Sequence, residues 1–433
     1  MQHIQGISRH QLQMSSLEDK ITADNPVRFI DAFVNHIDPV KIGFKPKILK
    51  TEGRPNFRLE VFLKLYLYGY LNGVRSSRRL EKECFRNIEV QWLLEAIYPN
   101  YHSIADFRKD NPKALKQLFK LFVSFLKDAE LIAGDTIAID GTKSRAHNSK
   151  KANYNQKKID KHKAYIDAKS QEYLDQLEQN DIQENPVVIK NIQQKIEGLK
   201  QNKIKYELLE EELKNSGEPQ ISTTDADARA LLVQGQVVEV SYNIQAAVDS
   251  KHNLVVATHT INRNDKNALA AIALEVKENL ALETFTVLVD KGYHNGRELH
   301  TCQQNNITTI VAVPEQGKSN ENGTQPEYLV SKFIYNKENN SYTCPEGKTL
   351  TTTGSWHKKT GRTEESGYNF QKYRTPACKT CLVKGLCTSR NGGREIDRSQ
   401  YADAVEENHQ RYKDNPQLYR KRQEINEHIF GTI

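Results

Sequence analysis

Apolar residues recur at helical spacing through the first part of the chain. The pattern predicts helices around 62–70, from Ser76 or Ser77 onward, over 88–97 and from Pro112 onward. Short helices joined by tight turns such as Asn72-Gly73 are typical of helix-turn-helix domains, although a plain helical bundle has the same pattern. In a helix-turn-helix domain, the arginines of the second helix would contact phosphates: Arg75, Arg78 and Arg79.

From Asp135 onward the pattern changes to short apolar strands. Strands are predicted over 136–139, 238–248, 254–261, 284–289 and 307–313, and helices over 265–282, 296–303 and 419–433. A helical hairpin with arms at 156–178 and 187–214, turning at Asn185-Pro186, is predicted between the first two strands. This order of elements is that of an RNase H-like α/β fold, in which helices connect the parallel strands of a mixed sheet.

The two patterns divide the chain into two predicted domains. Residues 1–130 would form a helical DNA-binding domain, and residues 131–433 an RNase H-like catalytic domain. Two insertions would interrupt the second domain, the helical hairpin at 150–220 and a Cys-containing, irregular stretch at 318–400. A chain of 433 residues is long enough for two or three folded units.

Composition and charge narrow the class of protein. Hydrophobic residues make up 37% of the chain, no apolar run approaches the roughly 18 residues of a membrane-spanning helix, and the first residues do not resemble a signal peptide. We therefore expect a cytoplasmic, nucleoid-associated protein without a membrane partner. The net charge of +7 is modest, but basic residues crowd the stretch 143–163, either as a solvated helix face or as a track for DNA. The residues expected to contact DNA there are Lys143, Arg145, Lys150 and Lys151.

Two aspartates, Asp140 and Asp290, each follow an apolar strand and are themselves followed closely by glycine. Both carboxylates would therefore emerge where backbone and substrate can approach closely. One such aspartate is an ordinary turn residue, but two on the first and fourth strands of this fold suit a pair of Mg²⁺ or Mn²⁺ ions for phosphoryl transfer. The last predicted helix would supply the third carboxylate, for which we choose Glu427, and Arg422 to hold the scissile phosphate.

Sequence blocks around these residues resemble the DDE transposases of insertion sequences, in the subgroup with a helical InsH-like N-terminal domain. In chain order the blocks are AIDGTKSRAHNSK at 138–150, STTDADAR at 222–229, VSYNIQAAVD at 240–249, VLVDKGYHNG at 287–296 and EHIFGTI at 427–433. The resemblance implies catalytic and metal-binding roles for Asp140, Asp290 and Glu427. It also assigns the family's accessory positions to Arg229, Asn243, Gln245 and Tyr293.

The resemblance implies Mg²⁺-dependent cleavage of double-stranded DNA at the inverted repeats of an insertion sequence, then strand transfer into target DNA, by a homodimer on DNA. The chain departs from the family at position 423, where glutamine replaces arginine, and the family's next lysine would fall just past Ile433. We therefore expect a truncated domain. The alternative is a catalytically impaired DNA-binding remnant that represses the element. A general RNase H-like nuclease would have no need of the N-terminal helical domain.

Six cysteines remain to be explained. Cys84 and Cys302 are predicted to be buried small hydrophobes, and disulfides are not expected in a cytoplasmic protein. The other four lie in the second insertion and include a C-x2-C pair. They would either bind one structural Zn²⁺ through four thiolates or remain reduced thiols: Cys344, Cys378, Cys381 and Cys387.

Overall fold

The computed structural model describes residues 10–12, 14–45, 56–147, 149–181, 186–233, 237–314, 324–361 and 367–431. The chain forms two compact units, residues 1–125 and 126–433. The predicted turn residue Asn185 lies outside the described residues. No helix in the described ranges combines the length and the apolar character needed to cross a membrane.

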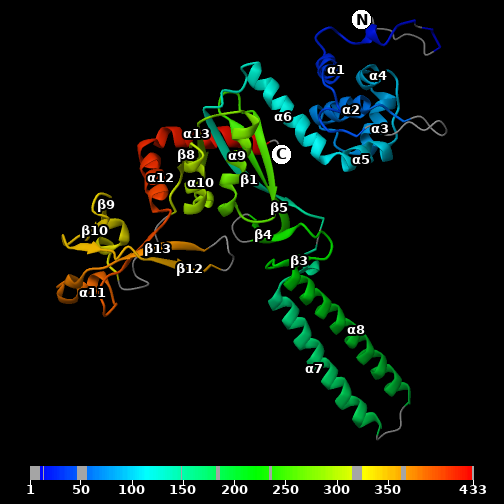
Figure 1. The fold of residues 1–433 in the computed structure, drawn as a ribbon. Coiled ribbons are helices and arrows are strands. Elements are labelled where there is room, and N and C mark those ends of the chain that lie inside the picture. The colour runs from blue at the N-terminus through cyan, green and yellow to red at the C-terminus, as the bar shows by residue number, and fades with distance from the viewer. Residues whose placement is uncertain are drawn as a thin grey trace, which may run out of the picture. The chain divides into compact units, whose positions relative to one another are not determined.

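The first unit is a set of short helices around an apolar core (Figure 1). Its helices are α1 (Pro26–His36), α2 (Leu59–Leu71), α3 (Ser77–Arg86), α4 (Ile88–Leu93), α5 (Tyr101–Asp110) and α6 (Pro112–Asp128), the last of which runs into the second unit. Asparagine side chains accept backbone N–H groups at the start of α1, α4 and α5, which fixes where these helices begin. Leu63, Leu65 and Leu80 are wholly buried in the core.

The predicted helix starts at Ser77 and Pro112 are confirmed. The helix predicted over 88–97 is shorter and ends at Leu93, because Glu95 and Ala96 adopt left-handed φ angles of 54° and 57° that a right-handed helix cannot contain. The sequence pattern does not predict α1 and α5.

A six-stranded mixed sheet forms the centre of the second unit. Its strands are β1 (Thr136–Arg145), β4 (Arg229–Val233), β5 (Val237–Asp249), β6 (Val255–Ile261), β7 (Phe285–Val289) and β8 (Ile307–Val311). The order is β4-β5-β1-β7-β8, with β6 also paired to β5. β5 runs antiparallel to β1, β4 and β6, whereas β1, β7 and β8 are parallel. The predicted succession of strands is confirmed, and β4 is added to it.

Helices pack against the central strands of this sheet and against its β8 edge (Figure 1). α9 (Leu269–Asn279) contacts β5 and β6, while α10 (Gly296–Gln304) and α12 (Ala402–Asp414) contact β8. α13 (Pro416–Phe430) lies against β1, β5 and β7, where Ile425 packs on Ala138 and Val248. The basic helix predicted near the end of the chain is thus confirmed and held against the central strand, whereas α12 was not predicted.

The first insertion is the predicted helical hairpin. α7 (Gln156–Asp181) and α8 (Pro186–Ser216) pack against each other and are joined at their base by the short pair β2 (Asn153–Tyr154) and β3 (Ile221–Ser222) (Figure 1). A small apolar cluster fixes this base: Tyr154, Ile159, Leu209, Leu213 and Ile221. The hairpin therefore has a core of its own at the end nearest the sheet.

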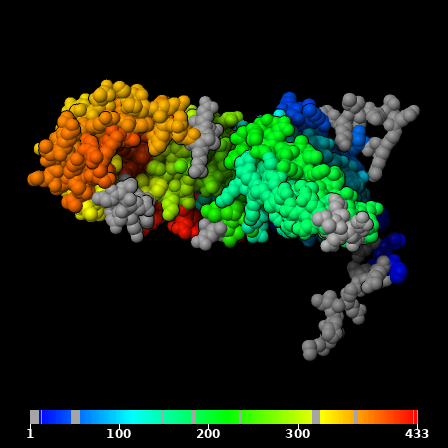
Figure 2. All heavy atoms as spheres, turned by 90° about the horizontal axis from the view of Figure 1, so that it is seen from below, coloured from blue at the N-terminus to red at the C-terminus, as the bar shows by residue number. Residues whose placement is uncertain are grey.

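The second insertion is more ordered than the sequence suggests. It contains two three-stranded sheets, β9 (Ile334–Asn336), β10 (Ser341–Thr343) and β11 (Thr349–Thr351), and β12 (Trp356–Lys359), β13 (Tyr368–Tyr373) and β14 (Ile396–Ser399). These segments, coloured yellow to orange, gather in one lobe (Figure 2). The prediction of an irregular stretch was wrong because strands of three to six residues leave little room for an alternating pattern.

Candidate active site

Asp140 lies inside the central strand and not at its end. β1 continues to Arg145 because residues 141–145 go on pairing with β5, so the prediction of a strand that ends before Asp140 was wrong. Pairing opposite Ala246 puts Asp140 on the sheet face that also presents Ala138 and is covered by α13. Its Oδ1 accepts the N–H of Gly141 at 2.8 Å, and its Oδ2 accepts Arg422 of α13 at 3.0 Å.

Asp290 follows β7 directly, as predicted. β7 pairs in parallel with β1 so that Leu288 lies opposite Ala138, and two residues further along each chain the same register sets Asp290 beside Asp140. Asp290 caps the short helix η4 (Lys291–Tyr293), where its carboxylate accepts the N–H of Gly292 at 2.7 Å. Asp140 on β1 and Asp290 just past the end of β7 therefore lie close together, and the charge of Asp290 acts on the pKa of Asp140.

The electrostatics of Asp140 reflect this proximity. Burial raises the pKa of Asp140, and the negative charges of Asp290 and Asp265 raise it further, while the Gly141 N–H and the Arg422 guanidinium oppose the shift. A half-buried carboxylate surrounded by like charges favours binding of a proton or a cation. The pair thus has the character of a cation site.

Asp265, at the start of η3 (Asp265–Asn267), is a third carboxylate that the sequence did not single out. A Cβ at position 141 would lie 2.9 Å from Asp265 Oδ1, and a Cβ at position 292 would lie 3.7 Å from Asp265 Oδ2. Each oxygen therefore faces one of the glycines that follow Asp140 and Asp290. Asp265 therefore lies beside the glycines that follow the two aspartates, and its charge raises the pKa of Asp140.

Asp265 is held by a buried polar network that includes three of the predicted accessory residues. Asn243 donates to Asp265 at 2.7 Å and Gln245 at 2.9 Å, and the hydroxyl of Tyr293 donates to the Gln245 side chain. All three of these side chains are wholly buried. Burial and the surrounding aspartates hold the pKa of Tyr293 well above its usual value, so its hydroxyl stays protonated and acts as a donor.

β5 therefore departs from the simple half-buried strand that its alternation predicts. Asn243 and Gln245 are fully buried on the side of Asp265, whereas the apolar Ile244 between them is only half-buried. The fourth accessory residue, Arg229, lies elsewhere: its guanidinium donates to the carbonyls of Ala226 and Ala228 and takes no part in the network.

α13 presents Arg422 to the site but turns Glu427 away. Ile425 and Asn426 face the sheet, with exposed fractions of 4% and 3%. Residues of an α-helix are about 100° apart, so Glu427 points outward, where it is exposed and accepts Gln423 at 2.7 Å. Among the described residues, Glu427 forms no ion pair with either aspartate, and no three His, Cys, Asp or Glu side chains form a ready metal-binding group. Neither end of the Asn426 amide has a hydrogen-bond partner in that part of the chain.

The predicted DNA contacts separate into exposed and internal side chains. Lys143 is paired with Asp265 at 3.2 Å and, like Arg422, is directed into the protein. Arg145 is exposed and pairs with Glu239, whereas Arg78 lies over the ring of Tyr101. The exposed members of the set are Arg75, Arg78, Arg79, Arg145, Lys150 and Lys151.

The cysteines also separate into two groups. Cys84 and Cys302 are buried, as predicted, and burial raises the pKa of each to about 12. Cys344, Cys378, Cys381 and Cys387 are half-buried, and all six are free cysteines.

Two family models match the chain. One, described as a transposase domain (DUF772), matches residues 15–110, in the first unit. The other, described as a transposase DDE domain, matches residues 343–433, which include α12 and α13. No curated protein and no solved structure matches the chain. Neither family match favours a DNA-binding remnant without catalytic function. Together the two matches support a DDE transposase of the insertion-sequence type, and the DDE domain match indicates an enzyme of the polynucleotidyl transferase and nuclease class.

Proposed function

We propose that this transposase cuts DNA at the ends of an insertion sequence in a reaction that depends on Mg²⁺, and joins the freed ends to target DNA. The observation that carries the proposal is the proximity of Asp140 on β1 to Asp290, just past the end of the adjacent parallel strand β7, where the basic helix α13 packs. The sheet itself supports an RNase H-like core, since the antiparallel run β6-β5-β1 continues into the parallel strands β7 and β8.

The two aspartates have the chemistry that Mg²⁺ or Mn²⁺ requires. Their hard carboxylate oxygens lie side by side, and each residue has one oxygen fixed by a backbone N–H, which orients the other. When bound, a pair of such ions would activate the attacking water or 3′-hydroxyl and offset charge on the phosphate. The protein's part is to fix the two carboxylates. The network of Asp265, Asn243 and Gln245, which packs against Gly141 and Gly292, would hold them in place.

Arg422 has two successive roles in this proposal. In the structure it neutralises Oδ2 of Asp140. With Asp140 holding a cation, the Arg422 guanidinium would be free to hold a scissile phosphate beside the same carboxylate. Arginine suits this role because it stays charged and matches the geometry of phosphate oxygens.

Glu427 completes the proposed metal site through a movement of α13. A turn of about 100° around the helix axis would exchange Glu427 for Asn426 at the sheet. Asn426 is buried with an amide that has no partner among the described residues, so exposing it removes an unfavourable burial. Glu427 is exposed and, among the described side chains, accepts a hydrogen bond from Gln423 of its own helix, a surface contact that costs little to break.

We assign DNA binding to exposed basic residues of both units. Arg75, Arg78 and Arg79 would contact phosphates of the inverted repeats from the first unit, and Arg145, Lys150 and Lys151 would contact DNA near the active site. A homodimer on DNA would pair the two ends of the element. These contacts position the duplex and leave the cleavage chemistry to the aspartates.

The proposal is tested by cleavage of a labelled duplex that carries the terminal repeat of the element. The unaltered chain should nick the end only with Mg²⁺ or Mn²⁺. Asp140→Asn and Asp290→Asn should bind the duplex and leave it intact, whereas Asp160→Asn, a change on the exposed face of α7, should cut normally. Metal-dependent cutting that persists in Asp140→Asn would overturn the proposal.

A further inference from the structure

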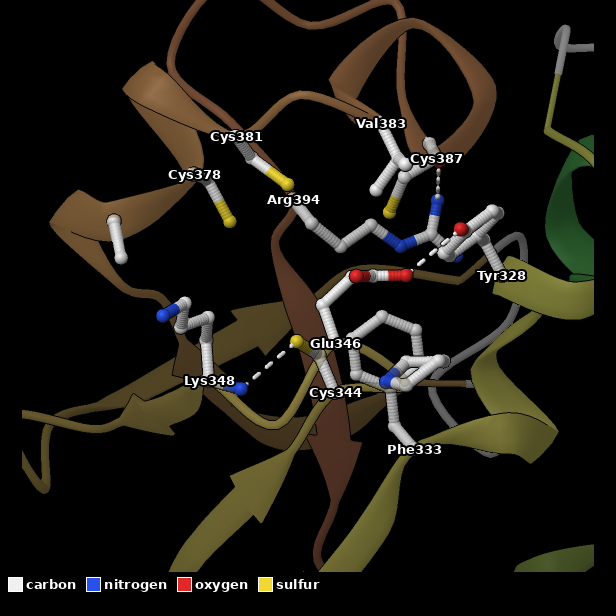
Figure 3. Close-up of a pocket in the computed structure, with 12 residues that line it drawn as sticks. Tyr328, Phe333, Cys344, Glu346, Lys348, Cys378, Cys381, Val383, Cys387 and Arg394 are labelled. Atoms are coloured by element: carbon white, nitrogen blue, oxygen red, sulfur yellow. Dashed lines mark hydrogen bonds between the residues drawn. The ribbon is translucent and has the colours of Figure 1, made fainter.

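Four cysteines of the second insertion line one small cavity. Cys344 follows β10, Cys378 lies in η9 (Pro376–Thr380), Cys381 follows η9, and Cys387 ends α11 (Lys384–Cys387). Their side chains come from three segments of the chain and line one small cavity (Figure 3). A small cavity lined by four sulfur atoms suits a single metal ion.

The backbone around Cys344 is shaped to hold a thiolate. The turn from Cys344 to Lys348 is closed by two hydrogen bonds of 2.9 Å, from Gly347 N–H to the Cys344 carbonyl and from Cys344 N–H to the Lys348 carbonyl. The N–H of Lys348 then donates to the Cys344 sulfur at 3.2 Å. Donors aimed at a sulfur stabilise its negative charge, as in the outer shell of metal sites.

A second cysteine is fitted to the cavity by a glycine. Gly393 has a φ of 92°, and a Cβ at this position would overlap the Cβ of Cys378 and lie 3.5 Å from its sulfur. The segment that follows α11 can therefore close over Cys378 only because residue 393 lacks a side chain. The backbone at Gly393 therefore packs directly against the Cys378 side chain.

The charges around the cavity favour thiolates that share a cation. Arg394 lines the cavity, and its guanidinium donates to the Cys387 carbonyl at 3.3 Å. The Nε of Arg394 is buried without a hydrogen-bond partner among the described residues. Four thiolates around a divalent cation would carry a net charge of −2, which this guanidinium would partly offset.

The lobe has a small core that would gain from a crosslink. Its buried apolar residues are Phe333, Tyr342, Leu350, Tyr373 and Ile396, with Cys344 and Cys387 packed against them. Small units with little apolar core commonly depend on a disulfide or a structural metal. A metal held by four cysteines would join the loops after β10, around η9 and at α11.

We propose that Cys344, Cys378, Cys381 and Cys387 bind one structural Zn²⁺ ion. Binding deprotonates the four thiols, releases their protons and forms four sulfur–zinc bonds without any change of oxidation state. The described side chains do not yet form a ready group of three metal ligands, so binding turns the sulfurs inward from the cavity wall. The ion fixes the lobe that leads into α12 and α13 and is separate from the catalytic metals.

The test is the zinc content of the full chain, purified under reducing conditions without added chelator. One zinc per chain is expected, released when a mercurial reagent has titrated four thiols. Replacement by Co²⁺ should give the intense visible bands of tetrahedral thiolate coordination. Cys378→Ser and Cys381→Ser should each lose most of the metal, while Cys84→Ala, a buried cysteine of the first unit, should retain it.

Three results would overturn the proposal: a reduced chain with no zinc, a disulfide between any of the four cysteines, or full zinc content in Cys378→Ser and Cys381→Ser together. If a serine variant fails to fold, the cobalt spectrum of the unaltered chain decides the matter. Octahedral, oxygen-type bands would then contradict a site of four thiolates.

Discussion

The guanidinium of Arg422 lies 3.0 Å from Oδ2 of Asp140, an ion pair that joins α13 to the central strand across 282 positions of sequence. Oδ1 of the same carboxylate is held by the Gly141 N–H. Both oxygens of Asp140 are therefore engaged, and a metal ion must compete with Arg422 for one of them. In the proposed mechanism, this competition would make Arg422 a determinant of both metal binding and phosphate binding.

Replacing Arg422 by glutamine should separate these two roles. Half-maximal cleavage is expected at a lower Mg²⁺ concentration, because the competing cation is gone. The maximal rate should fall by about 100-fold, the usual effect of losing one charged donor to a transition state. Rates over a Mg²⁺ titration measure both, with Arg420→Gln, an exposed residue of the same helix, as the control. An unchanged Mg²⁺ dependence would refute the competition.

Gly141→Ala should inactivate the enzyme through the network beneath Asp140. The added Cβ would lie 2.7 Å from Asn243 Oδ1 and 2.9 Å from Asp265 Oδ1, so the buried side chains must move. Overpacking of this kind lowers the free energy of unfolding by about 1–3 kcal/mol. Gly198→Ala is the control, since nothing lies within 4 Å of its Cβ and alanine favours a helix by about 1 kcal/mol. Denaturant unfolding and cleavage assays of both variants provide the comparison.

Asp265→Asn should weaken the same network while preserving its shape. Lys143, with an exposed side-chain fraction of 15%, would lose its charged partner, and the Asn243 and Gln245 amides would face a weaker acceptor. A loss of about 1–3 kcal/mol in the free energy of unfolding is expected, together with slower cleavage. Asp167→Asn removes an exposed pair with Lys203 and should cost less than about 1 kcal/mol. Equal effects of the two substitutions would remove Asp265 from its supporting role.

Arg398→Met should loosen the junction between the cysteine-containing lobe and α12. The Arg398 side chain is 7% exposed, pairs with Asp403 and Glu406 at 2.5 Å, and lies 3.6 Å from the ring of Tyr335. Both carboxylates are about half exposed, so a loss of roughly 1–3 kcal/mol is expected. Limited proteolysis should then cut the lobe faster. Lys337→Met, which removes only an exposed 3.8 Å pair with Asp403, should leave the cutting rate unchanged.

The order of strands in the second unit could be predicted because β5 is long and alternating, and because β7 and β8 are apolar runs bounded by turns. β4 and the strands of the second insertion could not, because each has too few buried residues to form a clear pattern. Asp140 and Asp290 were predicted from the strands before them, and the structure sets them side by side.

Asp265 could not be predicted in the same way. It follows Asn264 in a turn and looks like an ordinary helix-start residue. Its importance arises from the pairing of β5 with β6, which brings Asn243 opposite Ile261 and close to the Arg263 carbonyl. Burial of polar Asn243 and Gln245 on a strand is a signal that only the folded sheet reveals.

The most direct test of the central claim is metal-specific rescue of cysteine variants at the two aspartates. In Asp140→Cys and Asp290→Cys, a thiolate would replace a hard oxygen ligand, and it binds Mn²⁺ better than Mg²⁺. We predict that each variant fails to cleave the terminal repeat with Mg²⁺ and recovers cleavage with Mn²⁺, while Asp160→Cys cuts equally with both. Loss of cleavage with both metals, in folded variants that still bind the duplex, would contradict direct metal binding by Asp140 and Asp290.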